Sequence, residues 1–325
     1  MQFWKISFKS DEMIDIFEYD SSKKGEWNDF LCTSKNGTFL FNRDYMDYHK
    51  HRFLDNSLMI YEGKDLVALF PANRSSNCLI SHEGLTYGGL ITDERMKTSL
   101  MLKIFDNIVN YSKSRGINEI VYKNVPYIYH LIPSEEDLYA LFKKSAKLFR
   151  RDVSSTICLN NLINFQKNRI RAIKKARSLN IEVKEQRKLA PFWKILSANL
   201  SKKYGREPVH LLQEMEYLHG KFPKNIRLFA SYKDDLMLAG VMIYESVNVA
   251  HAQYIASDPD NVVPGSLDII FSYLIEEYSS KKNFFDFGIS TENNGTYLNE
   301  DLIFFKEGFG ARAIAYDSYR IDLHE

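Results

Sequence analysis

The chain has 325 residues, which is enough for two domains of ordinary size, each with its own hydrophobic core. Its 43 Lys and Arg residues almost balance its 42 Asp and Glu residues, so its overall charge does not attract it to nucleic acid or anionic lipid. The three cysteines are scattered, and they have neither metal-ligand nor redox spacing. The N-terminus turns acidic before any apolar run, and no window approaches the length of a membrane span. These features predict a soluble cytoplasmic protein without a signal peptide, a membrane span or a bound metal.

The N-terminal region mixes aromatic and charged residues. Trp27–Leu31 is predicted to be helical, and Thr38–Phe41 is predicted to be a short buried strand. His49 and His51 follow on a predicted helix. Their spacing resembles no common metal site on a helix, so we expect both on the surface.

Two similar series of elements then follow along the chain. The first has predicted strands at Ser57–Tyr61, Leu66–Pro71 and Cys78–Ile91, a helix at Glu94–Arg115 and a strand at Glu119–Val125. The second has predicted strands at Ile226–Tyr232, Leu236–Tyr244 and Val249–Ala256, a helix at Ser266–Lys281 and a strand at Phe284–Ile289. The shared order indicates a diverged duplication of one α/β unit, with domains at 1–160 and 161–325. Coincidence is the alternative, because a hairpin followed by a crossover helix is common.

The connection between the two series contains a strongly basic segment. Around it we predict helix at Tyr127–Arg150, Leu189–Tyr204 and Leu211–His219, and a strand at Ser154–Leu159. The segment Phe165–Leu179 combines an apolar stripe with six basic residues between Lys167 and Arg177. It is either an anion site for phosphate, tRNA or acidic lipid, or a solvated linker helix packed by its stripe. We favour the linker helix.

The stretch Val249–Ser290 carries the clearest functional signal. Its first strand is mostly apolar but includes His251, which we expect to be structural, and two further polar side chains. The following loop ends in Pro264-Gly265-Ser266, a helix-start signal. Because a helix N-terminus offers free amide hydrogens, this junction either binds phosphate or is an ordinary strand–helix crossover.

Two longer signatures point to a family. They are ISHEGLTYGGL at Ile80–Leu90, and FDFGISTE at Phe285–Glu292, which continues through Asn299 to KEGFGAR at Lys306–Arg312. Together with Gln253–Ala256, they resemble the tandem-domain acyltransferases of the GNAT superfamily found in bacterial surface-polysaccharide pathways. These enzymes are related to the Fem-type peptidoglycan bridge ligases. The resemblance covers nearly the whole chain, from Thr38 to Leu323.

This resemblance implies an α/β fold of two tandem GNAT-like domains, with mixed sheets flanked by helices. It also implies acyl-CoA as co-substrate, bound in the second copy between splayed strands, and no metal. The acceptor would be the amine of a nucleotide-linked, typically dTDP-linked, amino-deoxy sugar, which attacks directly without a covalent enzyme intermediate. We expect no nucleic-acid partner, and the sequence leaves the oligomeric state open. Two features depart from the family: the phosphate signature is missing from Asp258–Ser266, and Phe304 replaces a tyrosine that often protonates the leaving thiolate.

Acyl transfer to an amine needs a base, a donor for the oxyanion and a proton for the leaving group. The catalytic candidates are His82, Asp286 and Glu292. For these the alternatives are a core histidine, an ion-paired carboxylate and a solvated loop carboxylate, respectively. Candidate substrate-binding residues are Tyr87, His210, Gln253, Tyr254, Ser290 and Asn299, and candidate cofactor-binding residues are Ser257, Asn261, Gly265, Ser266 and Lys306.

Two rival functions remain open. A Fem-type ligase would carry amino acids from aminoacyl-tRNA to a peptidoglycan precursor, and the basic helix favours it. The balanced charge, and the lack of a long charged helical hairpin in the sequence, count against it. A non-catalytic module of the same fold would account for the missing phosphate signature and for Phe304.

Overall fold

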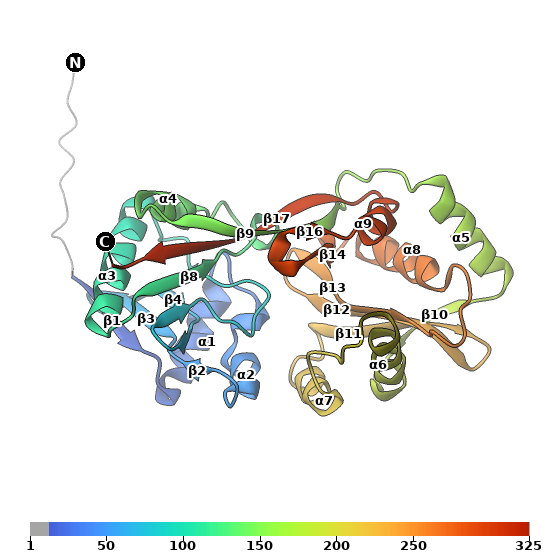
Figure 1. The fold of residues 1–325 in the computed structure, drawn as a ribbon, viewed down its shortest axis with the longest axis horizontal. Coiled ribbons are helices and arrows are strands. Elements are labelled where there is room, and N and C mark those ends of the chain that lie inside the picture. Colours follow the sequence, from blue (N-terminus) through green and yellow to red (C-terminus); the bar gives the residue numbers. More distant parts are fainter. Residues whose placement is uncertain (1–12, 325) are drawn as a thin grey trace, which may run out of the picture.

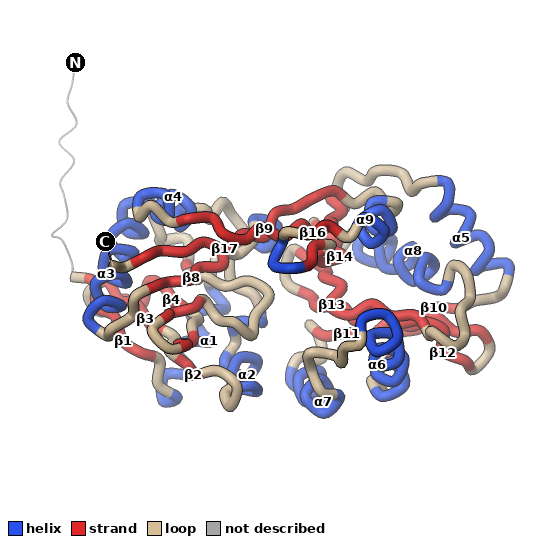
Figure 2. The backbone as a smooth tube through the Cα atoms, viewed as in Figure 1, coloured by secondary structure: helices blue, strands red, loops and turns tan. Residues whose placement is uncertain are grey.

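The computed structural model describes residues 13–324, which form two lobes side by side (Figure 1). Two long strands join the lobes: β9 (Lys147–Cys158) and β17 (Arg312–Asp322), which pair in antiparallel orientation. They run from one lobe into the other in Figures 1 and 2. Strand β17 also pairs with β8 (Glu119–Lys123), so the C-terminal strand completes the sheet of the N-terminal lobe. The division of the chain at residue 160 stays a prediction.

The C-terminal lobe is a sheet with helices on both faces. Its strands are β10 (Glu182–Gln186), β11 (Ile226–Lys233), β12 (Leu236–Glu245), β13 (Val249–Ser257) and β14 (Phe284–Ile289), hydrogen-bonded in that order. Helices α5 (Lys167–Ser178) and α8 (Ser266–Tyr278) lie on one side, and α6 (Ala190–Tyr204) and α7 (Leu212–Lys221) lie on the other (Figure 1). Because both faces are covered, β12 is a nearly continuous apolar run rather than an alternating one.

The N-terminal lobe repeats this plan with a divided sheet. One part has the order β1 (Ile14–Glu18), β3 (Leu58–Glu62), β4 (Asp65–Phe70) and β7 (Ile91–Thr92). The other part continues from β8 to β6 (Cys78–Ile80), β5 (Asn73–Ser75) and β2 (Leu54–Asp55). The helices of this lobe are α1 (Lys24–Thr33), α2 (Arg43–Met46), α3 (Thr98–Ser114) and α4 (Glu136–Lys143).

The predicted strand Cys78–Ile91 is wrong as a continuous element. It is present only at its ends, as β6 and β7, and residues 81–90 between them are not extended. His82 and Gly89 have φ values of +54° and +85°, which an extended strand does not allow. The segment is held instead by β8, because the amide of Lys123 donates to Ser81 Oγ over 2.7 Å and the Tyr122 hydroxyl accepts from the Leu90 amide.

Most of the predicted helices and strands are present, with ends shifted by a few residues, and three other local predictions fail. Thr38–Phe41 is not a strand, because it contains a 3-10 turn at Phe39–Phe41. Tyr127–Arg150 is helical only in α4 and a short turn, and β9 begins inside it. His49, expected on the surface, is only 1% exposed because it packs against Phe53 and His82.

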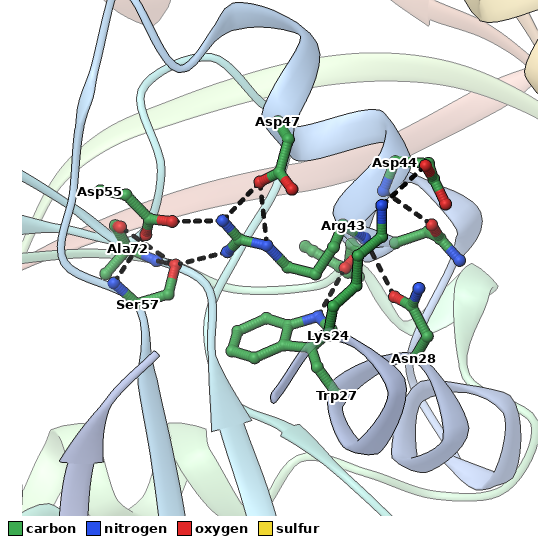
Figure 3. A network of polar contacts seen from close by, with 11 residues as sticks. Lys24, Trp27, Asn28, Arg43, Asp44, Asp47, Asp55, Ser57 and Ala72 are labelled. Carbon is green, nitrogen blue, oxygen red and sulfur yellow. Dashed lines mark hydrogen bonds and ion pairs between the residues drawn. The ribbon is translucent and has the colours of Figure 1, made fainter. Parts of the chain in front are cut away.

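Buried Arg43 links helix α2 to residues 55–57, which begin at strand β2 of the N-terminal lobe (Figure 3). The Arg43 guanidinium donates to Asp47, Asp55 and Ser57, and it lies 3.7 Å from the centre of the Tyr19 ring. The planar fork of donors satisfies two carboxylates at once, which limits the cost of burying the charge. None of the helices within residues 13–324 is both long and apolar enough to cross a membrane.

We expect Phe271→Ala to lower the free energy of unfolding by about 3–5 kcal/mol, because it empties the centre of an aromatic core. Phe271 on α8 is fully buried, and its ring contacts those of Phe285, Phe287, Phe305 and Phe309. Urea denaturation followed by circular dichroism measures the loss. Val262→Ala is the control, because Val262 is 75% exposed and its loss should cost less than about 0.5 kcal/mol. Equal losses in the two variants would contradict this description of the core.

Candidate active site

A cavity of about 890 Å³ lies where the two lobes meet. It opens at the point where β13 and β14 separate. The two strands pair in parallel only over Val249–His251 and Phe284–Asp286, and beyond that register they diverge. Gly288 contributes to the divergence, because its φ of +78° and a bulge between Asp286 and Ile289 turn β14 aside. The predicted splaying of these two strands is therefore present.

Side chains from both lobes and from the joining strands line this cavity. The N-terminal lobe contributes Glu83, Leu85, Thr86, Tyr87, Lys123 and Asn124. Strands β9 and β17 contribute Arg150, Asp152, Tyr316, Asp317 and Ser318. The C-terminal lobe contributes Asn199, Leu200, Lys203, residues 251–253, 255–257 and 287–289, Leu267, Asn299, Asp301, Leu302, Phe305 and Lys306. A ligand bound here would contact both copies of the repeated unit.

Asp286 lies at the floor of the cavity and is fully buried. Its Oδ1 accepts from the hydroxyls of Ser154 at 2.6 Å and Thr156 at 2.8 Å, both on β9. Its Oδ2 accepts from the Tyr316 hydroxyl at 2.9 Å and contacts Nδ1 of His251 at 2.8 Å. Burial alone would raise the pKa of Asp286, but the bonds from His251, Ser154 and Thr156 outweigh it and hold this pKa at about 2. Asp286 is therefore an ionised carboxylate that solvent does not reach.

His251 stands between this carboxylate and the cavity. It is a cavity-lining residue whose side chain is 12% exposed, and its Nδ1 faces Asp286. Within the described chain, its Nε2 atom has no hydrogen-bond partner, and it is not among the buried unpaired atoms. Gly288 is beside the ring edge, where a Cβ atom would lie 3.3 Å from Cε1 of His251. His251 therefore reaches the cavity, although it was expected to be structural.

Lys306 and Lys123 reach the cavity, and each is bonded to backbone carbonyls rather than to a carboxylate. Lys306 on α9 (Glu300–Glu307) is 2% exposed and donates to the carbonyls of Gly288 at 2.8 Å and Ile289 at 2.7 Å. Lys123 at the end of β8 donates to the carbonyls of His82 and Leu85. Burial lowers the pKa of each lysine to about 8, and for Lys123 the nearby Arg150 guanidinium adds to the effect. Each ammonium has a third hydrogen, which a ligand in the cavity could accept.

The predicted site residues divide between the cavity and its surroundings. Those that line the cavity are Tyr87, Gln253, Ser257, Asn299 and Lys306. Asp286 is behind His251. Glu292 is exposed on the hairpin of β15 (Thr291–Glu292) and β16 (Tyr297–Leu298), where it accepts from Asn299 at 2.8 Å. Ser290 is buried next to this hairpin, and its hydroxyl has no partner among the described residues.

His82 and His210 lie outside the cavity lining, in the packed region between the lobes. The His82 ring contacts His49 and Phe53, and burial lowers its pKa to about 3. Nδ1 of His210 is 2.5 Å from the hydroxyl of Tyr254, another predicted site residue that does not line the cavity. Burial lowers the pKa of His210 to about 4. The structure therefore brings neither of these histidines to the cavity.

The predicted phosphate loop borders the cavity only at its ends, where Ser257 and Leu267 line it, and residues 258–266 do not line it. Asn261 is exposed and bonds to Asp258, and Gly265 begins α8 with a φ of +86°. A Cβ atom on Gly265 would lie 2.3 Å from the carbonyl oxygen of Ala172, so α5 packs directly onto this turn. Ser266 is buried. The first turn of α8 also contains Asp268, which pairs with Arg169 of α5 at 2.8 Å. A carboxylate and a neighbouring helix thus already occupy the positive end of α8.

Several cavity residues gave no signal in the sequence. Arg150, Asp152 and Tyr316 lie on β9 and β17, and these strands come together only through long-range pairing. Phe304, in the position expected for an acid, is 55% exposed and does not line the cavity. In the described part of the chain, no group of three or more His, Cys, Asp or Glu side chains is placed to hold a metal ion.

Comparison with solved structures identifies the fold. FemX superposes with a TM-score of 0.67 and 10% identity, over 95% of this chain and 97% of FemX. L-PGS from Bacillus licheniformis gives 0.58 and 13%, over 95% of this chain and 93% of that one. A tandem GNAT protein from the clavulanic acid biosynthesis pathway gives 0.53 and 8%, over 96% and 99% of the two chains. No family model and no curated protein matches the sequence. The predicted fold of two tandem GNAT-like domains is confirmed.

We expect Asp286→Asn to remove one component of the acid denaturation of this protein. The carboxyl has a pKa of about 2 in the folded state against 3.8 in the unfolded state. A lowered folded-state pKa stabilises the protein above pH 3.8, and this stabilisation is lost as the pH falls through about 2. The difference corresponds to about 2 kcal/mol.

Urea denaturation of wild type and variant at pH 6, 4, 3 and 2 measures this component. The wild type should lose about 2 kcal/mol more than the variant across this range. Parallel pH profiles for the two proteins would show that Asp286 is not held ionised by its four bonds.

Proposed function

We propose that this chain is a transferase that moves an acyl group from an activated carrier to an amine bound in the cavity. The observation that carries the proposal is the cavity at the fork of β13 and β14, in a tandem GNAT-like fold. Small-molecule sites have volumes of about 300–1,000 Å³, so a cavity of about 890 Å³ has room for an acyl arm and an acceptor. Its side chains include several cations and carboxylates, which suits a polar acceptor.

We further propose that the carrier is aminoacyl-tRNA, as in the Fem-type ligases, which are related to the acyltransferases that the sequence resembles, and that the acceptor is a peptidoglycan precursor. Two features support this carrier over acyl-CoA. The positive end of α8, which would hold the pyrophosphate of CoA, is covered by α5 and carries Asp268. The pair of Asp268 with Arg169 neutralises this helix end, so it offers little attraction to phosphate. FemX also superposes with a higher TM-score than the tandem GNAT protein reported above.

The basic face of α5 is a third feature that supports an RNA carrier. The helix packs on α8 through its buried residues Ile173 and Ala176. Its exposed cations have no carboxylate partner among residues 13–324; they are Lys167, Arg171, Lys174, Lys175 and Arg177. Clustered cations without partners attract a polyphosphate backbone.

A second candidate is transfer from acyl-CoA to the amine of a nucleotide-linked amino sugar. One observation favours it: over Ala252–Ser257, the edge of β13 that faces the cavity has no partner strand. An extended arm with amide groups, such as the pantetheine of CoA, could pair with that edge as an added strand.

The choice of carrier predicts a difference in binding. Purified protein should bind aminoacyl-tRNA in a filter-binding assay and should transfer the labelled aminoacyl group to a peptidoglycan precursor. Calorimetric titration with acetyl-CoA should give little or no heat, because the N-terminus of α8, which would bind the pyrophosphate of CoA, is covered. Tight CoA binding with acylation of nucleotide amino sugars would favour the second candidate instead, and inactivity with both carriers would contradict the transferase proposal.

The double variant Lys174→Glu/Arg177→Glu should weaken tRNA binding by about tenfold or more. The slope of log K against log salt should also become shallower by about 2, because each lost phosphate contact removes about 1. Binding at several salt concentrations measures both effects. The matched control Lys64→Glu/Lys224→Glu changes two exposed lysines elsewhere and should bind like wild type. If the control loses as much affinity as the α5 variant, the attraction is general and α5 is not the RNA surface.

A further inference from the structure

We infer that His251 is the general base of this transferase, and that Asp286 is the positioning residue that orients its ring. The inference rests on the proposed function for the reaction, whereas the His251–Asp286 geometry stands independently of it. Asp286 was the sequence candidate for the base, but it is fully buried and cannot touch a substrate. The ring of His251 separates it from the cavity.

The position of His251 follows from the fork in the sheet. His251 and Asp286 form the last residue pair of the parallel β13–β14 register before the strands separate. Their side chains therefore meet at the apex of the cavity, where Nδ1 and Oδ2 are 2.8 Å apart. An acyl arm and an acceptor lying between the strands would both pass this apex.

The hydrogen bonds of Asp286 determine which ring nitrogen carries the proton. An ionised carboxylate only accepts, and three hydroxyl groups already donate to Asp286. Nδ1 of His251 must therefore be the protonated nitrogen. In the neutral ring, Nε2 then keeps its lone pair, and among residues 13–324 no donor bonds to it. A neutral imidazole with a free lone pair at the cavity wall is a base ready to accept a proton.

A purely structural histidine would look different. His130, for comparison, is half-buried like His251, but its Nε2 contacts the carbonyl of Val125 at 3.0 Å. The other ionisable groups packed around His251 are Tyr316 on β17, Tyr244 beside it on β12, and Lys306, which is tied to the neighbouring Gly288. Tyr316 bonds to Asp286, Tyr244 is in the buried core, and Lys306 is cationic. Of these groups, His251 is the one that presents an unoccupied acceptor nitrogen to the cavity.

His251 is placed to take a proton from the attacking amine and to return it to the leaving group. The acceptor amine attacks the acyl carbonyl carbon, and Nε2 takes a proton from the amine as the new C–N bond forms. The bond between the carbonyl carbon and the carrier oxygen then breaks, or the C–S bond if the carrier is CoA. The imidazolium returns its proton to the leaving oxygen or sulfur, and Asp286 stabilises the positive ring in between.

Two substitutions of His251 test its role. His251→Gln removes the base but keeps an N–H that can reach Asp286, and His251→Ala leaves space for added imidazole. Each should lower kcat by roughly 10²–10⁴-fold with a much smaller change in KM, and imidazole should restore at least part of the rate of the alanine variant. His51→Ala, an exposed histidine outside the cavity, should behave like wild type. A kcat within threefold of wild type in His251→Gln would overturn the inference.

A measurement without substrate separates this inference from the proposed function. Nitrogen-15 NMR of the imidazole rings, assigned with His251→Gln, reports which nitrogen of His251 carries the proton. We expect the Nδ1–H tautomer in wild type and a loss of that preference in Asp286→Asn. The Nε2–H tautomer in wild type would overturn the inference, whatever the activity. If no carrier supports transfer but the Nδ1–H tautomer is found, the proposed reaction fails while the oriented imidazole stands.

Discussion

The buried carboxylate of Asp286 is the interaction on which the rest of this structure depends. An isolated charge in a protein interior is very unfavourable, and it is tolerated only when its acceptor sites are filled. Here the donors come from β9, β13 and β17, so one side chain links three strands around β14. Because β9 and β17 also join the lobes, the same bonds fix the floor of the cavity relative to both copies of the repeated unit.

The two copies use the same fork of strands in different ways. In the C-terminal lobe β13 and β14 separate and leave a cavity, whereas in the N-terminal lobe residues 81–90 fold against the end of β8 at the corresponding place. In the first copy, Ser81, Leu85 and the Gly88-Gly89 pair therefore occupy the place where the second copy has its cavity. The ISHEGLTYGGL segment thus packs the first copy, and its middle residues, Glu83 and Leu85–Tyr87, also line the cavity.

The electrostatics of the cavity differ from those of a helix-end phosphate site. The positive end of α8 is neutralised internally by Asp268 and Arg169, so it offers little to a ligand. The cavity has positive charge of its own, which includes Lys306 and Lys123, whose ammonium groups are bonded to backbone carbonyls rather than to carboxylates. Buried charges held this way act more strongly on a nearby anion or a developing oxyanion than charges in bulk water do.

The family resemblance implied the fork between Val249–Ala256 and Phe284–Ile289, whereas local patterns in the sequence determined the class of fold and the order of the hairpins and crossover helices. These features depend on periodicity, capping and apolar runs, which are properties of neighbouring residues. Only the tertiary structure decided that His251 reaches the cavity, that His82 and His210 do not, and that Ser154, Thr156 and Tyr316 satisfy Asp286. Those contacts join residues far apart in the chain, and the pairing of distant strands sets them, which no local pattern reports.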